Sequence, residues 1–180
     1  MTDAQTGRRA SSLRQRDFRL LIIGKTFGWM ALHMMMVAIA YQVYDRTGDV
    51  MNLAYIGLAT FAPAIWFALI TGYVADLFDR RFVLVICYGV IFGATVLLFA
   101  YTVSGIQAVW PVFAILALEG TGRAFHQPAV NSLVPNLVPR ESFPNAVAWH
   151  STVNKITQVV GPALGGVLYL AGPEIVYAVA

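Results

Sequence analysis

Long apolar runs separated by short polar breaks form the pattern of this sequence. A helix needs roughly 20 mostly apolar residues to cross a bilayer. Five runs reach that length, at residues 18–44, 51–75, 82–103, 109–134 and 145–171. A sixth apolar run begins after Pro173 and contains only residues 174–180. The pattern predicts an all-α membrane protein with five complete spans and the start of a sixth, and we expect a longer protein to contain the rest.

Composition supports the membrane and disfavours several other classes. Hydrophobic residues make up 58% of the 180 residues and charged residues 12%, against about 25% charged in a typical soluble domain. The single cysteine, Cys87, cannot form an intramolecular disulfide or a cysteine metal cluster. No catalytic Ser/His/Asp arrangement, metal-ligand spacing or cofactor motif is evident. We therefore expect a lipid bilayer as the partner, with no enzyme activity, metal, cofactor or nucleic acid.

Basic residues are distributed unevenly between the two sides of the predicted spans. The net charge is +3, but in a membrane protein the position of each Lys and Arg sets the orientation. One side has Arg46 alone, whereas the other has Arg8, Arg9, Arg14, Arg16, Arg19, Arg80, Arg81 and Arg140. This bias predicts a multi-pass protein whose N-terminus, including a basic tail at residues 1–17, lies in the cytoplasm.

The fourth span contains three ionisable residues, Glu119, Arg123 and His126. A charge within a span costs roughly 2.5–3.5 kcal/mol on insertion scales, so each one is a candidate for function. The spacing of i, i+4 and i+7 places all three on one narrow stripe of a helix, and Glu119 four residues before Arg123 suits an ion pair. Two interpretations remain open: a pair that only holds helices together, or a stripe that lines an aqueous pathway.

The fifth span has a related stripe. Asn154, Lys155 and Gln158 occupy its first half, and the small residues Gly161 and Gly165 follow on nearly the same face. A pair of glycines four residues apart lets another helix approach closely. Glu119 and Lys155 are both about 15 Å from the start of their own spans, from the helical rise of 1.5 Å per residue. A pair between these two residues across helices is therefore possible.

The first span contains Lys25 and His33. Lys25 lies near the predicted cytoplasmic end, where its long side chain could reach the membrane surface instead of serving a site. His33 lies deeper. It is either a hydrogen-bonded packing residue or a proton carrier, and the sequence leaves both interpretations open.

Three motifs resemble those of the major facilitator superfamily of transporters. The segment 72–81, after the second span, resembles the cytoplasmic loop motif GxxxD(R/K)xGR(R/K) in Gly72, Asp76, Arg80 and Arg81. Leu77 and Asp79 replace the usual basic residue and glycine of that motif. The loop would form a charged latch at the cytoplasmic mouth, although ordinary positive flanking of a span is the alternative.

The other two motifs lie within spans. Gly161, Pro162, Gly165 and Gly166 resemble the motif gxxxGPxxGG of proton-coupled exporters, with Thr157 in place of its first glycine. Arg123 resembles the buried arginine of the superfamily's fourth span, which is implicated in proton coupling. The sequence around it, and the segment 16–19, are most similar to the bacterial branch of transmembrane secretion effectors and siderophore exporters.

The resemblance implies the first half of a twelve-helix transporter of the bacterial plasma membrane, cut in its sixth helix. The missing C-terminal half would complete a midplane cavity for a small-molecule substrate. The resemblance also implies an antiporter that uses the proton gradient for efflux. We hypothesise that Glu119 is the protonation site and that Arg123 modulates it. The alternative is a non-transporting membrane fragment or half-module that needs a partner chain.

Overall fold

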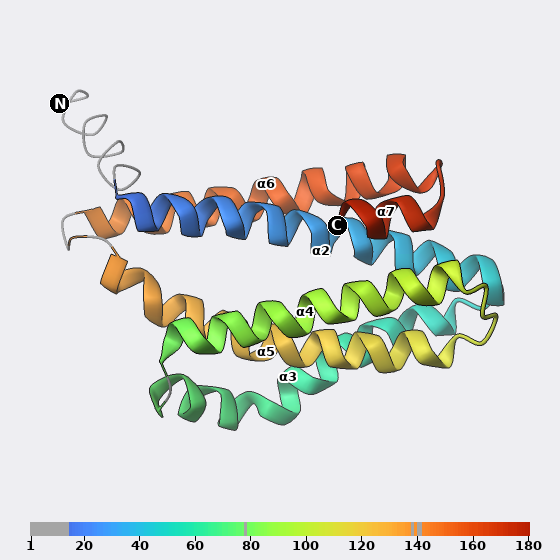
Figure 1. Ribbon diagram of the computed structural model, residues 1–180, viewed down its shortest axis with the longest axis horizontal. Helices are drawn as coiled ribbons and strands as arrows, with labels where there is room; N and C mark the ends of the chain where they lie inside the picture. Colours follow the sequence, from blue (N-terminus) through green and yellow to red (C-terminus); the bar gives the residue numbers. More distant parts are fainter. Residues whose placement is uncertain (1–14, 78, 138, 140–141) are drawn as a thin grey trace.

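The computed structural model describes residues 15–180 except 78, 138, 140 and 141 (Figure 1). Most of the predicted basic tail and Arg140 lie outside the described residues. The chain forms six described helices: α2 (Arg16–Thr47), α3 (Met51–Leu77), α4 (Arg80–Val103), α5 (Trp110–Leu137), α6 (Phe143–Tyr169) and α7 (Pro173–Val179). The described part of the chain contains no strand, so the prediction of an all-α protein is confirmed.

The long helices run back and forth, so that successive connections lie at opposite ends of the molecule (Figure 1). They form two layers. One layer contains α2, α6 and α7, and the other contains α3, α4 and α5, with α5 packed against both of its neighbours. We call the end at which α2 begins the inner end, because the charge bias predicts it to be cytoplasmic, and the opposite end the outer end.

Local chemistry explains where several helices begin and end. Gly48 stops α2 in the left-handed conformation, at a φ of 62°, and its N–H donates to the carbonyl of Tyr44. Few residues other than glycine adopt this conformation without strain. Asp79 caps α4, since its side chain accepts a hydrogen bond from the backbone N–H of Arg81 at 2.9 Å. Proline stands in the first turn of both α6 and α7, where the absence of an N–H has no cost.

Three helical stretches are long and apolar enough to cross a bilayer, in a search of the described residues: Arg16–Thr47, Met51–Ala68 and Arg81–Val103. Helices α5 and α6 have 28 and 27 residues, a length that suffices for a span. Both contain the polar stripes predicted from the sequence, and these residues reduce their hydropathy. The crossing of the membrane by α5 and α6 remains a prediction.

Two apolar clusters fill the bundle at different depths. The outer cluster includes Met35, Ile39 and Leu98, and the inner cluster includes Phe18 and Val130. On α2 and α5, the stretches between these clusters contain, among apolar residues, Lys25, His33, Glu119, Arg123 and His126. We call these five residues the polar band. The fold therefore places the polar band between two apolar layers.

A hydrogen-bonded cluster fastens the outer end. Gln42 on α2 donates to the Thr102 hydroxyl on α4 at 3.0 Å, and the Tyr177 hydroxyl on α7 donates to the Gln42 carbonyl oxygen at 2.7 Å. One turn further along α2, Arg46 donates to the Tyr101 hydroxyl at 2.6 Å. These bonds connect α2, α4 and α7, so the two layers are joined by polar contacts at this end.

Candidate functional site

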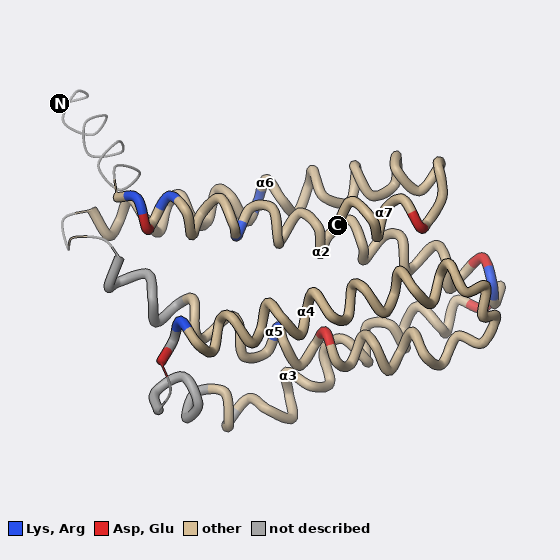
Figure 2. The backbone as a smooth tube through the Cα atoms, in the orientation of Figure 1, with Lys and Arg blue, Asp and Glu red and all other residues tan. Residues whose placement is uncertain are grey.

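Figure 2 shows that the Lys, Arg, Asp and Glu residues gather at the two ends of the bundle, with few between them. The central ones include the predicted pair on α5. Arg123 Nη1 lies 3.6 Å from Glu119 Oε1, and the two side chains are one helical turn apart. The Glu119 side chain is 5% exposed, whereas that of Arg123 is 26% exposed. The carboxylate is thus enclosed by protein, and the guanidinium extends toward a more open region.

Trp29 on α2 brings several basic groups together. Its ring lies 5.7 Å from the Arg123 guanidinium carbon and 5.8 Å from the Lys25 ammonium nitrogen. Cations within about 6 Å of an aromatic face are attracted by its quadrupole. The ring of His33, one turn further along α2, is 5.8 Å from the same indole. Trp29 therefore links polar residues of the first span with the ion pair of the fourth.

Lys25 lies in the interior of the bundle. It is 1% exposed, and its ammonium nitrogen is hydrogen-bonded to Nε2 of His150 on α6. In this structure the side chain does not extend to the membrane surface, which the sequence had left as one option. The bond joins residues 125 positions apart, and it fastens α2 to α6 near the inner end of the polar band.

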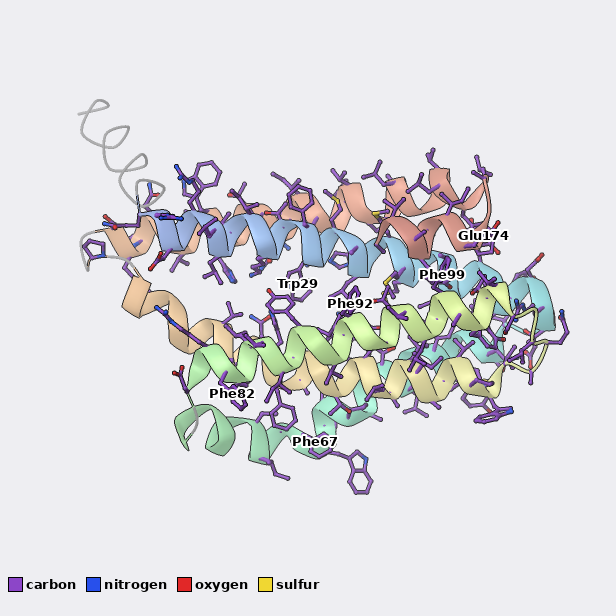
Figure 3. The ribbon with its side chains drawn as sticks, in the orientation of Figure 1. Trp29, Phe67, Phe82, Phe92, Phe99 and Glu174 are labelled. Atoms are coloured by element: carbon purple, nitrogen blue, oxygen red, sulfur yellow. The ribbon has the colours of Figure 1, made fainter. Side chains whose placement is uncertain are left out.

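A cavity of about 310 Å³ lies among α2, α3, α4 and α5. The residues that matter most for its chemistry are Trp29, Thr60, Tyr88, Arg123, His126 and Gln127. Figure 3 shows Trp29 in the region between the two layers. His126 is 5% exposed, its ring packs edge-to-face on Tyr88 at 5.0 Å, and its Nε2 has no hydrogen-bond partner among the described residues. The cavity thus contains a guanidinium, an unpaired imidazole nitrogen and aromatic walls.

The polar stripe of α6 is divided. Lys155 and Gln158 are exposed, away from the ion pair, so the possible contact between Glu119 and Lys155 is not formed. Asn154 is half-buried, and its side-chain oxygen has no partner among the described residues. The Nε2 atom of His33 is likewise buried and without a described partner. The structure therefore brings Lys25, His33, Glu119, Arg123 and His126 to one region and leaves Lys155 and Gln158 outside it.

The glycines of the exporter-like motif have different surroundings. A Cβ atom built on Gly161 would lie 2.5 Å from the Cβ of His33, and one on Gly165 would lie 2.6 Å from the carbonyl oxygen of Met34. These two glycines allow α6 to lie directly against α2. Gly166 has open space around it, and Pro162 lies within the helix and is half-buried. The close approach expected for Gly161 and Gly165 is present in the structure.

The loop motif can be compared with the structure only in part. The surroundings of Gly72 and the side chains of Asp76 and Arg80 are outside what the structure describes, so the latch remains a prediction. Asp79, which departs from the family motif, has a visible role as the N-cap of α4. Its carboxylate bonds to the backbone of Arg81, the last residue of the motif.

Sequence reasoning missed several residues of this region. Trp29, Tyr88 and His150 contact the predicted residues from other helices, and their sequence neighbourhoods give no sign of it. The segment Gly120–Gly122 offered a signal, since it places two glycines between the two residues of the ion pair. A Cβ on Gly120 would collide with the Thr60 carbonyl, and one on Gly122 would crowd Val90 at 3.2 Å. Both glycines thus let α5 approach its neighbours.

Comparison with known proteins finds sequence relatives among transporters. The chain is 27% identical over 152 residues to macrolide efflux protein A of Streptococcus pyogenes, and the matched region covers 84% of this chain and 38% of that protein. It is 29% identical over 157 residues to an uncharacterised major-facilitator-type transporter of Bacillus subtilis, and the matched region covers 87% of this chain and 36% of that protein. It is 30% identical over 121 residues to the staphyloferrin A transporter of Staphylococcus aureus, and the matched region covers 65% of this chain and 30% of that protein.

The chain thus spans little more than a third of the length of the first two relatives. No solved structure matches the chain. The family model for transmembrane secretion effectors matches residues 8–180, which is nearly the whole sequence. The chain belongs to the transmembrane secretion effector family of the major facilitator superfamily.

Proposed function

We propose that this chain forms the first half of a proton-coupled efflux transporter of the bacterial plasma membrane. The substrate, a small molecule, would bind between this bundle and a second six-helix half, and the two halves would open the site to one side at a time. Family membership supports transport, and the relatives named for macrolide efflux and for staphyloferrin A support a small-molecule substrate.

The observation that carries the proposal is the buried ion pair beside the cavity. Glu119 is 5% exposed, and its described ionic partner is Arg123, which is more exposed and lines the cavity. A carboxylate taken out of water needs a partner charge or a proton. When Glu119 is ionised, it pairs with Arg123. When a proton from outside neutralises it, the guanidinium loses its counter-charge and is free to bind elsewhere in the cavity.

This change would couple the proton to the movement of the helices. Protonation adds one net positive charge to the polar band and weakens the hold of Glu119 on Arg123. The rigid contact of α2 with α6 through Gly161 and Gly165 would carry the change to the rest of the bundle. The loop motif would latch the inner side when the site faces outward.

The test is Glu119→Gln in the full-length protein, assayed in everted membrane vesicles with a macrolide and with staphyloferrin A. Glutamine imitates the neutral carboxyl and cannot release a proton. We expect uptake driven by an imposed pH gradient to disappear, while exchange of labelled for unlabelled substrate continues. Glu174→Gln, an exposed carboxylate at the outer end, is the matched control and should retain both activities.

Unchanged pH-driven uptake in Glu119→Gln would show that Glu119 is not the coupling site. Absence of transport by the unaltered protein, for these compounds and for a wider panel of small molecules, would contradict the efflux function itself.

A further inference from the structure

The polar band contains more basic than acidic side chains. Among the described residues of the five long helices, Glu119 is the one carboxylate that lies more than a turn from a helix end, since Asp17 and Asp45 lie within a turn of one. Lys25 and Arg123 are the cations gathered around Trp29 in the same region. One positive charge is therefore uncompensated when Glu119 is ionised.

Lys25 is the cation that lacks a carboxylate. It is almost fully buried, and its described contacts are a hydrogen bond with His150 and the face of the Trp29 ring. Neither group carries a negative charge. A buried ammonium without a counter-ion is costly, because it loses its hydration without gaining an ionic partner. The surroundings of Lys25 thus favour the entry of an anion.

His126 gives an independent reason to expect a ligand. It lines the cavity, is 95% buried, and its Nε2 has no partner among the described residues. Buried polar atoms nearly always have a hydrogen-bond partner in folded proteins. An imidazole nitrogen that carries a proton can donate to an oxygen atom of a bound molecule. The Arg123 guanidinium, which lines the same cavity, provides further donors.

We infer that this cavity binds an anionic group of the transported molecule, such as a carboxylate, with Arg123 and His126 as its direct partners and Lys25 as a second fixed charge. The inference rests on the proposed function, because it takes the cavity to lie on the substrate path. The aromatic walls, Trp29 and Tyr88, would pack against an apolar body that carries the anionic group. A cationic substrate would be repelled by the surplus charge and would compete with Arg123 for Glu119.

The direction of transport agrees with this charge. A bacterial membrane is negative inside, and this potential drives an anion outward. Export of an anionic compound therefore follows the electrical gradient, whereas export of a cation opposes it. The same residues that neutralise the anion in the cavity thus suit a substrate whose efflux the potential assists.

Three probes of one shape test the inference in purified full-length protein: 2-naphthoate, the neutral 2-naphthamide and the cationic 2-naphthylmethylammonium. Binding is measured by isothermal titration calorimetry, without any proton gradient. We expect naphthoate to bind about ten-fold tighter than either analogue, because hydrogen bonds to a charged partner are the stronger kind. Equal affinities, tighter binding of the cation, or binding of none of the three would overturn the inference.

Two variants locate the site. The double variant Glu119→Gln with Arg123→Gln removes both charges of the ion pair and one direct donor to the anion, and it should reduce naphthoate affinity about ten-fold, the range of a charge-assisted bond. Lys25→Gln removes the second fixed charge, which makes no direct bond to the anion, and it should also reduce the affinity. Arg19→Gln, an exposed cation on the same helix, should leave the affinity unchanged. Naphthoate preference that persists in both variants places the anion elsewhere and contradicts the inference. The proton-coupling test with Glu119→Gln is a separate measurement, so either idea can fail while the other stands.

Discussion

The contact between α6 and α2 depends on Gly165 having no side chain. A Cβ atom at this position would lie 2.6 Å from the carbonyl oxygen and 2.8 Å from the Cα of Met34. Both are backbone atoms, so no rotation of a side chain can relieve the collision. Ordinary contact begins at about 3.4 Å, so Gly165→Ala must separate the two helices locally by about 0.8 Å. We predict that this single methyl group destabilises the bundle.

The size of the effect follows from two destabilising contributions and one that opposes them. Forcing an extra methyl group into a packed interface typically costs about 1–3 kcal/mol. A gap of 0.5–1 Å also removes about a quarter to a half of the dispersion attraction between neighbouring atoms that no longer touch. Alanine is preferred over glycine within a helix by about 1 kcal/mol, which offsets part of this loss. We therefore expect a net decrease of about 1–2 kcal/mol in the free energy of unfolding.

Gly166→Ala is the matched control, because it lies in the same helix and motif but has nothing within 4 Å of the added Cβ. It gains the helix preference without the collision. The melting temperature of the full-length protein, followed by size-exclusion chromatography of heated samples, should be lower for Gly165→Ala than for Gly166→Ala. Equal melting temperatures for the two variants would refute the argument that the backbones of α2 and α6 touch at Gly165.

Two further predictions concern other contacts of the bundle, and the same melting assay checks both. Gly120→Ala should lower the melting temperature more than Gly93→Ala, because the added Cβ would collide with the backbone carbonyl of Thr60, whereas Gly93 has open space around it. A larger decrease for Gly93→Ala would contradict the packing of α5 on α3. Tyr177→Phe should cost about 0.5–1.5 kcal/mol by removing the hydrogen bond to Gln42, and an unchanged melting temperature would contradict a contribution from that bond.

The number and extent of the helices were predictable because they depend on local properties. Each of the five long apolar runs became one helix, and the ends differ by a few residues. Gly48 illustrates the reason, since the left-handed conformation that stops α2 follows from the residue type at that position. The spacing of Glu119 and Arg123 likewise sufficed to predict their ion pair, because both residues lie on one helix.

Contacts between helices were harder to predict, because they depend on how each helix is rotated about its own axis. The equal depth of Glu119 and Lys155 in their spans made a pair between them possible, yet Glu119 is buried against Arg123 and Lys155 is exposed. The position of Lys25 near the end of its span likewise allowed its side chain to extend to the membrane surface. Its actual partner, His150, comes from a helix more than a hundred residues later in the chain, and no pattern in the sequence connects the two.

The different exposure of Glu119 and Arg123 bears on the two interpretations of their pair. Glu119 and Arg123 lie one turn apart on α5, so the pair does not itself join two helices. In the structure the carboxylate is enclosed, but the guanidinium is 26% exposed and lines the cavity beside Trp29. In this geometry, a proton on Glu119 would remove the counter-charge of a guanidinium that lines the cavity. The proposed role of the pair in proton coupling rests on this asymmetry, and the transport assay of Glu119→Gln tests it.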